Sequence, residues 1–162
     1  MWKINSLNVE ILALVESGCR HIQVDEPVFA RKSQMALDYG IENIERCFDG
    51  VPDHVTRAVH ICCGYPNALD SENYLKAPSS AYFELAEAMD ESSVNAVSIE
   101  DAHRPNDLKL LELFKKTSVI IGLIDVAKSR LEESSEIKLR INNCLEHIDH
   151  NRLIAAPDCG LG

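Results

Sequence analysis

The sequence lacks a basic excess, a long apolar run and an export signal, and each absence excludes a class of protein. Its 162 residues carry a formal net charge of −10, whereas a nucleic-acid partner requires a basic face. No window approaches the roughly 18 uninterrupted apolar residues of a membrane-spanning helix. The first residues show no signal-peptide pattern. We therefore expect a cytoplasmic protein with neither a nucleic-acid nor a membrane partner.

Paired cysteines and glycine-rich nucleotide motifs are also missing. The six cysteines include no Cys-x-x-Cys pair, which argues against a zinc ribbon or a thioredoxin-like redox site. Without an export signal, they are expected to be free thiols rather than a disulfide framework. No Gly-x-Gly-x-x-Gly or Walker sequence follows an apolar run, and this weakens a nucleotide-binding interpretation.

Five short apolar runs alternate with stretches of helical periodicity. The expected strands are residues 21–27, 58–62, 95–100, 118–125 and 152–157. The expected helices lie around residues 7–15, 37–48 and 82–89, then after a cap at Asn106, and finally in a segment that Ser134 or Ser135 opens. Repeated βα units of this kind form either a doubly wound parallel sheet or a (β/α)8 barrel. One residue from each run should be buried, namely Val24, Val59, Val97, Ile121 and Ile154.

The barrel is the preferred fold, because side chains suited to catalysis or metal binding lie at the C-terminal ends of four of the five runs. Barrels carry their active sites at these strand ends. A closed barrel typically takes about 250 residues, and only five strands are predicted here. We therefore expect residues 1–162 to form one partial catalytic (β/α)8 TIM-barrel domain of about five C-terminal βα units. About three earlier units and the last helix would be missing. Open sheet edges would favour association with a second copy.

Four candidate metal ligands occupy these strand ends. His60 and Cys62 share one face of their strand, Glu100 closes the next run, and Cys159 follows the last one. Two thiolates and an imidazole are ligands that zinc prefers, with the carboxylate as the weakest member. Taken alone, the His-x-Cys pattern is a weak signal, because such a histidine is more often hydrogen-bonded in a core than bound to a metal. The shared position of all four at strand ends is what favours a metal site for the activation of a thiol.

Other polar residues near the strand ends allow several roles. Asp25 and Glu26 are consecutive, so one should face the barrel mouth and the other a neighbouring loop, unless both lie in a solvated turn. Arg104 is a candidate for holding an anionic group or a neighbouring carboxylate. Asp125 and Asp158 are candidates for orienting the metal-binding histidine.

Five ordered motifs give the sequence a specific resemblance to the cobalamin-independent methionine synthases. The motifs are residues 22–27 (IQVDEP), 60–62 (HIC), 98–100 (SIE), 122–125 (GLID) and 157–160 (PDCG). The resemblance implies one zinc ion held by His60, Cys62, Glu100 and Cys159, and an Asp25 carboxylate that binds the amino group of homocysteine. It also implies a partner substrate that donates the methyl group, either a methyl-folate or another donor.

Two departures from the family pattern qualify this resemblance. Its early strands have no counterpart here, and Ala127 stands where full-length enzymes carry a histidine shortly after the aspartate of the fourth motif. The chain is more similar to the short, single-barrel relatives. The leading hypothesis is zinc-dependent methyl transfer to homocysteine, forming methionine. The alternatives are alkyl transfer to another small thiol, or an inactive fragment that keeps its zinc ligands.

Overall fold

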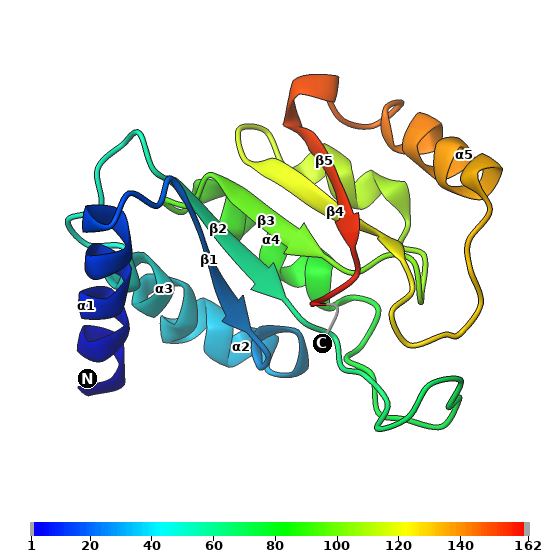
Figure 1. Ribbon diagram of the computed structural model, residues 1–162, viewed down its shortest axis with the longest axis horizontal. Helices are drawn as coiled ribbons and strands as arrows, with labels where there is room; N and C mark the ends of the chain where they lie inside the picture. The colour runs from blue at the N-terminus through cyan, green and yellow to red at the C-terminus, as the bar shows by residue number, and fades with distance from the viewer. Residues whose placement is uncertain (1, 161–162) are drawn as a thin grey trace.

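Strands alternate with helices in the computed structural model, which describes residues 2–160, and the strands form one parallel sheet (Figure 1). The strands are β1 (His21–Glu26), β2 (Thr56–Ile61), β3 (Ala96–Ile99), β4 (Ser118–Ile124) and β5 (Leu153–Pro157). The α-helices are α1 (Trp2–Glu16), α2 (Ser33–Met35), α3 (Ile41–Cys47), α4 (Ala81–Glu91) and α5 (Ser134–Cys144). A π-helical segment, Ala36–Gly40, joins α2 to α3, and short 3-10 helices lie at Phe29–Arg31, Leu108–Leu113 and His150–Arg152. All five expected strands are present.

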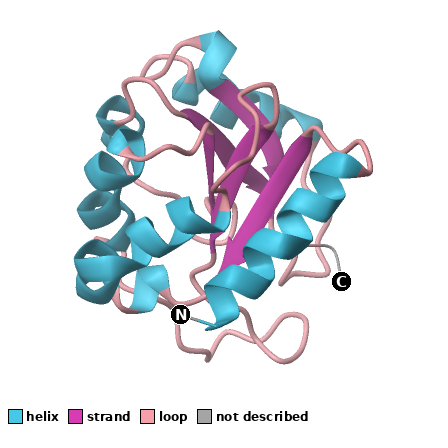
Figure 2. Cartoon of the chain, turned by 90° about the vertical axis from the view of Figure 1, so that its left-hand side faces the viewer, coloured by secondary structure: helices cyan, strands magenta, loops and turns pink. Residues whose placement is uncertain are grey.

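The strands pair in parallel in the order β1-β2-β3-β4-β5. This order confirms the prediction, because an open doubly wound sheet would reverse its strand order midway. The sheet is part of a (β/α)8 barrel, and the C-terminal ends of its strands lie at one edge. In the view turned by 90°, helices are seen beside the strands, which run through the middle of the molecule (Figure 2). No helix within residues 2–160 is long and apolar enough to cross a membrane.

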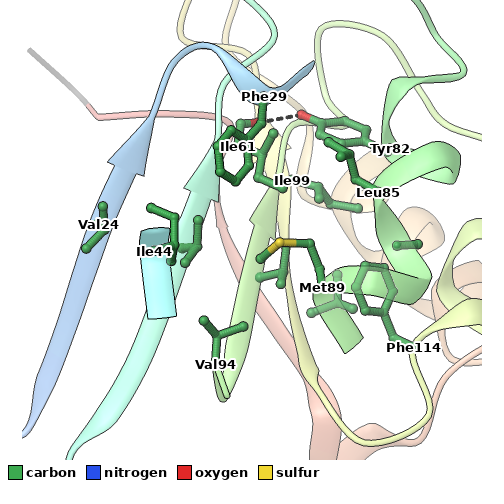
Figure 3. Packing of buried hydrophobic residues seen from close by; sticks show 14 of the residues in the cluster. Val24, Phe29, Ile44, Ile61, Tyr82, Leu85, Met89, Val94, Ile99 and Phe114 are labelled. Atoms are coloured by element: carbon green, nitrogen blue, oxygen red, sulfur yellow. Dashed lines mark hydrogen bonds between the residues drawn. The ribbon is translucent and has the colours of Figure 1, made fainter. Parts of the chain in front are cut away.

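The core lies between the convex face of the sheet and its helices. Figure 3 shows Leu85 and Met89 of α4 directed toward the strands, where Ile61 and Ile99 are buried. Helix α4 follows from its apolar residues at spacings of three and four, which form one face. Burial of each such side chain contributes about 1.5–3 kcal/mol.

One burial prediction is wrong, and it concerns the concave face of the sheet, which lies opposite the helices. Val24, Val59, Val97 and Ile121 are buried, but Ile154 is 45% exposed. The parallel register pairs Ile154 with Ile120, on the face that also carries Gln23, His60 and Ser98. Because no described helix covers that face and β5 is an edge strand, Ile154 remains in contact with solvent.

One helix start differs from expectation and another agrees with it. The segment Leu108–Leu113 is a 3-10 helix capped by the Asp107 carboxylate, which accepts a hydrogen bond from the Lys109 amide, rather than an α-helix capped by Asn106. Helix α5 opens at Ser134, as predicted, and the preceding Glu133 caps it in a capping box with Glu136.

Candidate metal centre

Four side chains from three strand ends meet at the C-terminal edge of the sheet. One potential ligand atom from each of His60, Cys62, Glu100 and Cys159 lies within 4.8 Å of the other three. His60 belongs to β2, Cys62 follows it, and Glu100 and Cys159 follow β3 and β5. The parallel strands therefore bring together His60 and Cys159, which are 99 positions apart in the sequence. These four residues could hold a metal ion.

The imidazole of His60 is oriented toward this cluster by its neighbour on β3. Its Nδ1 lies 2.9 Å from the hydroxyl oxygen of Ser98, and the sheet register places the two residues side by side. The other ring nitrogen, Nε2, is buried and has no hydrogen-bond partner within residues 2–160. Burial lowers the pKa of His60, although the nearby Asp25 and Asp158 carboxylates oppose this effect. A neutral ring with a free Nε2 lone pair is the form that binds a metal ion.

The Glu100 carboxylate is buried and poorly compensated. The residue is 1% exposed, and neither carboxylate oxygen has a well-formed hydrogen bond among the described residues. Burial raises the pKa of Glu100 to about 7, although the Cys63 amide, His103 and the Cys62 thiol favour the charged form. Buried polar groups without partners are costly. A bound cation would satisfy Glu100 and the free nitrogen of His60 together.

The two thiols also lack a compensating positive charge. Burial, reinforced by the Glu100 carboxylate, raises the pKa of Cys62 to about 12. Burial likewise raises the pKa of Cys159. These thiols therefore stay protonated at neutral pH unless a cation replaces their protons, as a metal ion does when it binds thiolate. The donor set thus fits a metal ion.

Tyr82 joins the two strands that carry the first three candidate ligands, a role that the sequence did not indicate. Its hydroxyl donates a hydrogen bond to the Ile61 carbonyl (2.8 Å, Figure 3) and accepts one from the Glu100 amide (3.0 Å). The tyrosine was expected only as part of an apolar helix face. Its hydroxyl fixes the spacing between the end of β2 and the start of the Glu100 loop.

The turn after Cys62 requires glycine. Gly64 has a φ of 111°, and a Cβ there would lie 2.5 Å from Nη2 of Arg31. Arg104 braces the same loop by donating a hydrogen bond to the Ala77 carbonyl (2.8 Å) and contacting the Cys63 sulfur (3.8 Å). Arg104 therefore holds the loop. Among residues 2–160 it pairs with no carboxylate, so the expected ion pair is wrong, whereas a role in holding an anionic substrate group stays a prediction.

Asp25 and Glu26 diverge, as predicted. Asp25 lies at the mouth of a cavity of about 610 Å³ that is also lined by Gln23, His60 and Ser98. Its Oδ1 is 3.9 Å from Nε2 of His60, and its side chain is 65% exposed. Glu26 points elsewhere and accepts hydrogen bonds from the amides of residues 28 and 29. Of these two carboxylates, Asp25 is the one that lines the cavity beside the ligand cluster.

The expected role of Asp125 and Asp158 in orienting His60 is wrong for both residues. Asp125 accepts a hydrogen bond from the Ala127 amide within its own turn. Asp158 accepts hydrogen bonds from the loop that follows Glu100. Ser98 orients His60 instead, and the sequence signal for it was a polar residue next to His60 in the parallel register of an otherwise apolar strand.

Comparison with known proteins identifies the family. The family model described as "Cobalamin-independent synthase, Catalytic domain" matches residues 4–162, so the chain belongs to this family. It is 30% identical to a methionine synthase of Thermococcus kodakarensis over 156 residues, which cover 96% of this chain and 41% of that protein. A methionine synthase of Saccharolobus islandicus is 29% identical over 160 residues, with 42% of its length covered. The chain thus spans less than half the length of these relatives.

Solved structures give the same assignment. A B12-independent methionine synthase from Shewanella sp. W3-18-1, in complex with selenomethionine, superposes with a TM-score of 0.82 at 29% identity. The match covers 96% of this chain and 46% of that one. A putative B12-independent methionine synthase from Listeria monocytogenes, at 19% identity and a TM-score of 0.71, supports the fold.

Proposed function

We propose that this chain carries the zinc site of an enzyme that transfers a methyl group to the thiol of homocysteine and forms methionine. The observation that carries the proposal is the convergence of His60, Cys62, Glu100 and Cys159. The buried Nε2 of His60 and both carboxylate oxygens of Glu100 have no well-formed hydrogen bond among the described residues. The family supplies the expectation of the reaction. The methionine synthases that the chain resembles are more than twice its length, so the activity belongs to the complete protein.

Zinc is the metal that the donor set favours. One imidazole nitrogen, two sulfur atoms and one carboxylate oxygen form a four-coordinate set that suits zinc. In a tetrahedral zinc site with ordinary bond lengths, ligand atoms are roughly 3.3–3.8 Å apart. The separations of up to 4.8 Å in this structure therefore require only a small contraction.

The chain supplies an ammonium-binding group beside the metal site. Asp25 is exposed to the cavity that His60 and Ser98 also line, so its carboxylate could accept the α-ammonium group of an amino acid whose thiol reaches the ligand cluster. Homocysteine carries both of these groups, a thiol and an α-ammonium group. When bound, zinc would favour the thiolate form of the substrate and fix the direction of its attack.

The residues of this chain indicate less about the methyl donor than about the thiol. Ala127 replaces the histidine that full-length relatives are expected to carry, and so this position supplies no proton to a leaving group. The donor can therefore be a methyl-folate or another methylated compound. Because Ala127 leaves the donor open, alkyl transfer to a different small thiol is the second candidate function.

Metal analysis of cysteine variants tests the site. We expect Cys62→Ser and Cys159→Ser to lose most of their bound zinc, because each removes one of two thiolate ligands. Cys19→Ser is the matched control, since Cys19 is exposed and belongs to no part of the cluster. Full zinc retention in both site variants would contradict the proposed metal site.

Substrate binding requires a separate measurement. Zinc X-ray absorption with homocysteine should show one light ligand replaced by sulfur, and an unchanged spectrum at saturating thiol would reject thiol activation. Asp25→Asn should weaken homocysteine binding, and 4-mercaptobutyrate, which lacks the ammonium group, should bind equally to both proteins. If Asp25→Asn leaves the preference for homocysteine intact, Asp25 is not the ammonium site.

A further inference from the structure

The Asp158 carboxylate makes four hydrogen bonds to the loop that follows Glu100. Its Oδ1 accepts hydrogen bonds from the amides of Asp101 and Ala102, both at 2.8 Å. Its Oδ2 lies 2.8 Å from the amide nitrogen of His103 and 2.8 Å from the Nδ1 atom of the same residue. Asp158 has no exposed surface. A single buried carboxylate therefore holds three consecutive residues of that loop.

This carboxylate connects the chain segments of two candidate ligands. Asp158 immediately precedes Cys159, and the three residues that it holds immediately follow Glu100. The Asp158 amide also donates to the Ile124 carbonyl at the end of β4 (3.0 Å). The contact thus links the ends of β3, β4 and β5, although β3 and β5 are not neighbours in the sheet.

Gly122 on β4 makes room for this link. A Cβ atom at Gly122 would lie 1.9 Å from Oδ1 of Asp158 and 2.7 Å from its Cα atom. Because the backbone of Asp158 would be struck as well, no side-chain rotation could relieve the clash. The glycine lets the carboxylate pass across β4 and reach the loop after β3.

From this geometry we propose that Asp158 is a positioning residue that sets the distance between the metal ligands Glu100 and Cys159. The inference rests on the proposed metal site and deepens it. Four hydrogen bonds fix the loop on the C-terminal side of Glu100, while Tyr82 fixes the amide of Glu100 itself. The Glu100 carboxylate, which has no well-formed hydrogen bond of its own, is thereby held from both sides.

Asp90 provides a matched control for a purely structural carboxylate. It is also buried and accepts hydrogen bonds from three consecutive amides, those of Lys115, Lys116 and Thr117. These amides precede β4, at the end of the sheet opposite the ligand cluster. Asp90→Asn should therefore reduce stability as Asp158→Asn does, but without changing the metal site.

The first test measures zinc affinity by competition with a chelator. We expect Asp158→Asn to bind zinc roughly 10–100-fold more weakly than the wild type, which is typical when a partner of a metal ligand is removed. Asp90→Asn should bind zinc as the wild type does. Equal affinity in Asp158→Asn and wild type, or equal losses in both aspartate variants, would overturn the proposal. Failure of the wild type to bind zinc would instead reject the proposed function.

A double-mutant cycle shows whether Asp158 acts through Glu100. If it does, Asp158→Asn should cost little further affinity once Glu100→Ala has removed the carboxylate ligand, and additive losses would show independent effects. Cobalt(II) spectra give a second readout. Asp158→Asn should keep the thiolate-to-cobalt absorption and change the ligand-field bands in the same way as Glu100→Ala. An Asp158→Asn spectrum identical to that of the wild type would contradict the role.

His103→Ala keeps the test decisive if Asp158→Asn does not fold. This variant removes the ring donor to Asp158 together with the contact between the ring and Glu100 (Nδ1 to Oε2, 3.6 Å), and it leaves the three backbone amides bonded to Asp158. We expect zinc binding to weaken by about threefold or more, in the direction of the aspartate variant. Unchanged zinc affinity and an unchanged cobalt spectrum in His103→Ala would then overturn the proposal.

Discussion

The Nδ1 atom of His60 lies 2.9 Å from the hydroxyl oxygen of Ser98 on the neighbouring strand. Both residues are buried, and their positions are fixed by the parallel register of β2 and β3. When Nδ1 carries the proton and donates it to Ser98, the lone pair of Nε2 points into the ligand cluster. The sheet therefore provides a partner for the tautomer that can bind a metal ion.

Ser98→Ala should weaken zinc binding by about tenfold, because the His60 ring loses the partner that fixes its orientation. Chelator competition measures this change. Ser118→Ala is the control, since Ser118 lies on the same face of the sheet but at the start of β4, away from the C-terminal strand ends that carry the ligands. Equal zinc affinities for Ser98→Ala and the wild type would show that packing alone holds the ring.

Tyr82→Phe should lower the free energy of unfolding by about 1–3 kcal/mol, because the Glu100 amide loses its acceptor and the Ile61 carbonyl loses a donor in a buried place. Urea denaturation measures the loss. Zinc affinity should fall as well, since the same hydroxyl sets the spacing of two ligand-bearing segments. Tyr74→Phe, in the loop after β2, is the conservative control. A fully stable Tyr82→Phe protein would contradict the bridging role.

The strands could be predicted because buried parallel strands are continuous apolar runs of simple composition. The convergence of His60, Cys62, Glu100 and Cys159 was also predictable, since parallel strands end at one edge of their sheet. The roles of Ser98 and Tyr82 were not, because each depends on which residue lies beside it in the register or across a helix contact. Tyr82 in particular has the spacing of a core residue, and only its hydroxyl reveals the second role.

The missed features share a physical cause. Ile154 has the composition of a buried strand residue, but its exposure depends on what covers the concave face, which local sequence does not determine. Asp107 provides the cap that was expected from Asn106, because neighbouring side chains could each accept the same amide hydrogen bonds. Sequence patterns predict that a cap exists more readily than which residue provides it.

The stability contributed by Asp90 should depend on pH. Burial alone would raise its pKa, but the hydrogen bonds from the amides of Thr117, Lys115 and Lys116 outweigh that effect and hold the pKa of Asp90 below its ordinary value. A lowered folded-state pKa gives stability that is fully present above the unfolded value of about 3.9 and is lost as the pH falls through the folded value. The difference in unfolding free energy between wild type and Asp90→Asn should therefore be largest near pH 7 and shrink below about pH 4.

Urea denaturation of both proteins across this pH range provides the measurement, and groups common to both cancel in the difference. Asp53→Asn is the control, because Asp53 is fully exposed and its ion pair with Arg57 lies at the surface. That variant should match the wild type at every pH. A difference for Asp90→Asn that stays constant down to pH 3 would mean that its charge does not contribute.

The edges of the sheet should cause this chain to associate. Within residues 2–160, β1 and β5 each pair with one strand only, so their outer backbone groups are available to another strand. Ile154 on β5 adds an exposed apolar side chain. We expect sedimentation velocity to show a coefficient that rises with protein concentration, and Ile154→Lys to reduce this rise, because lysine on an edge strand opposes pairing. Leu139→Lys, on the exposed surface of α5, is the control and should associate as the wild type does. A concentration-independent monomer for the wild type would show that these edges are already protected within the folded chain.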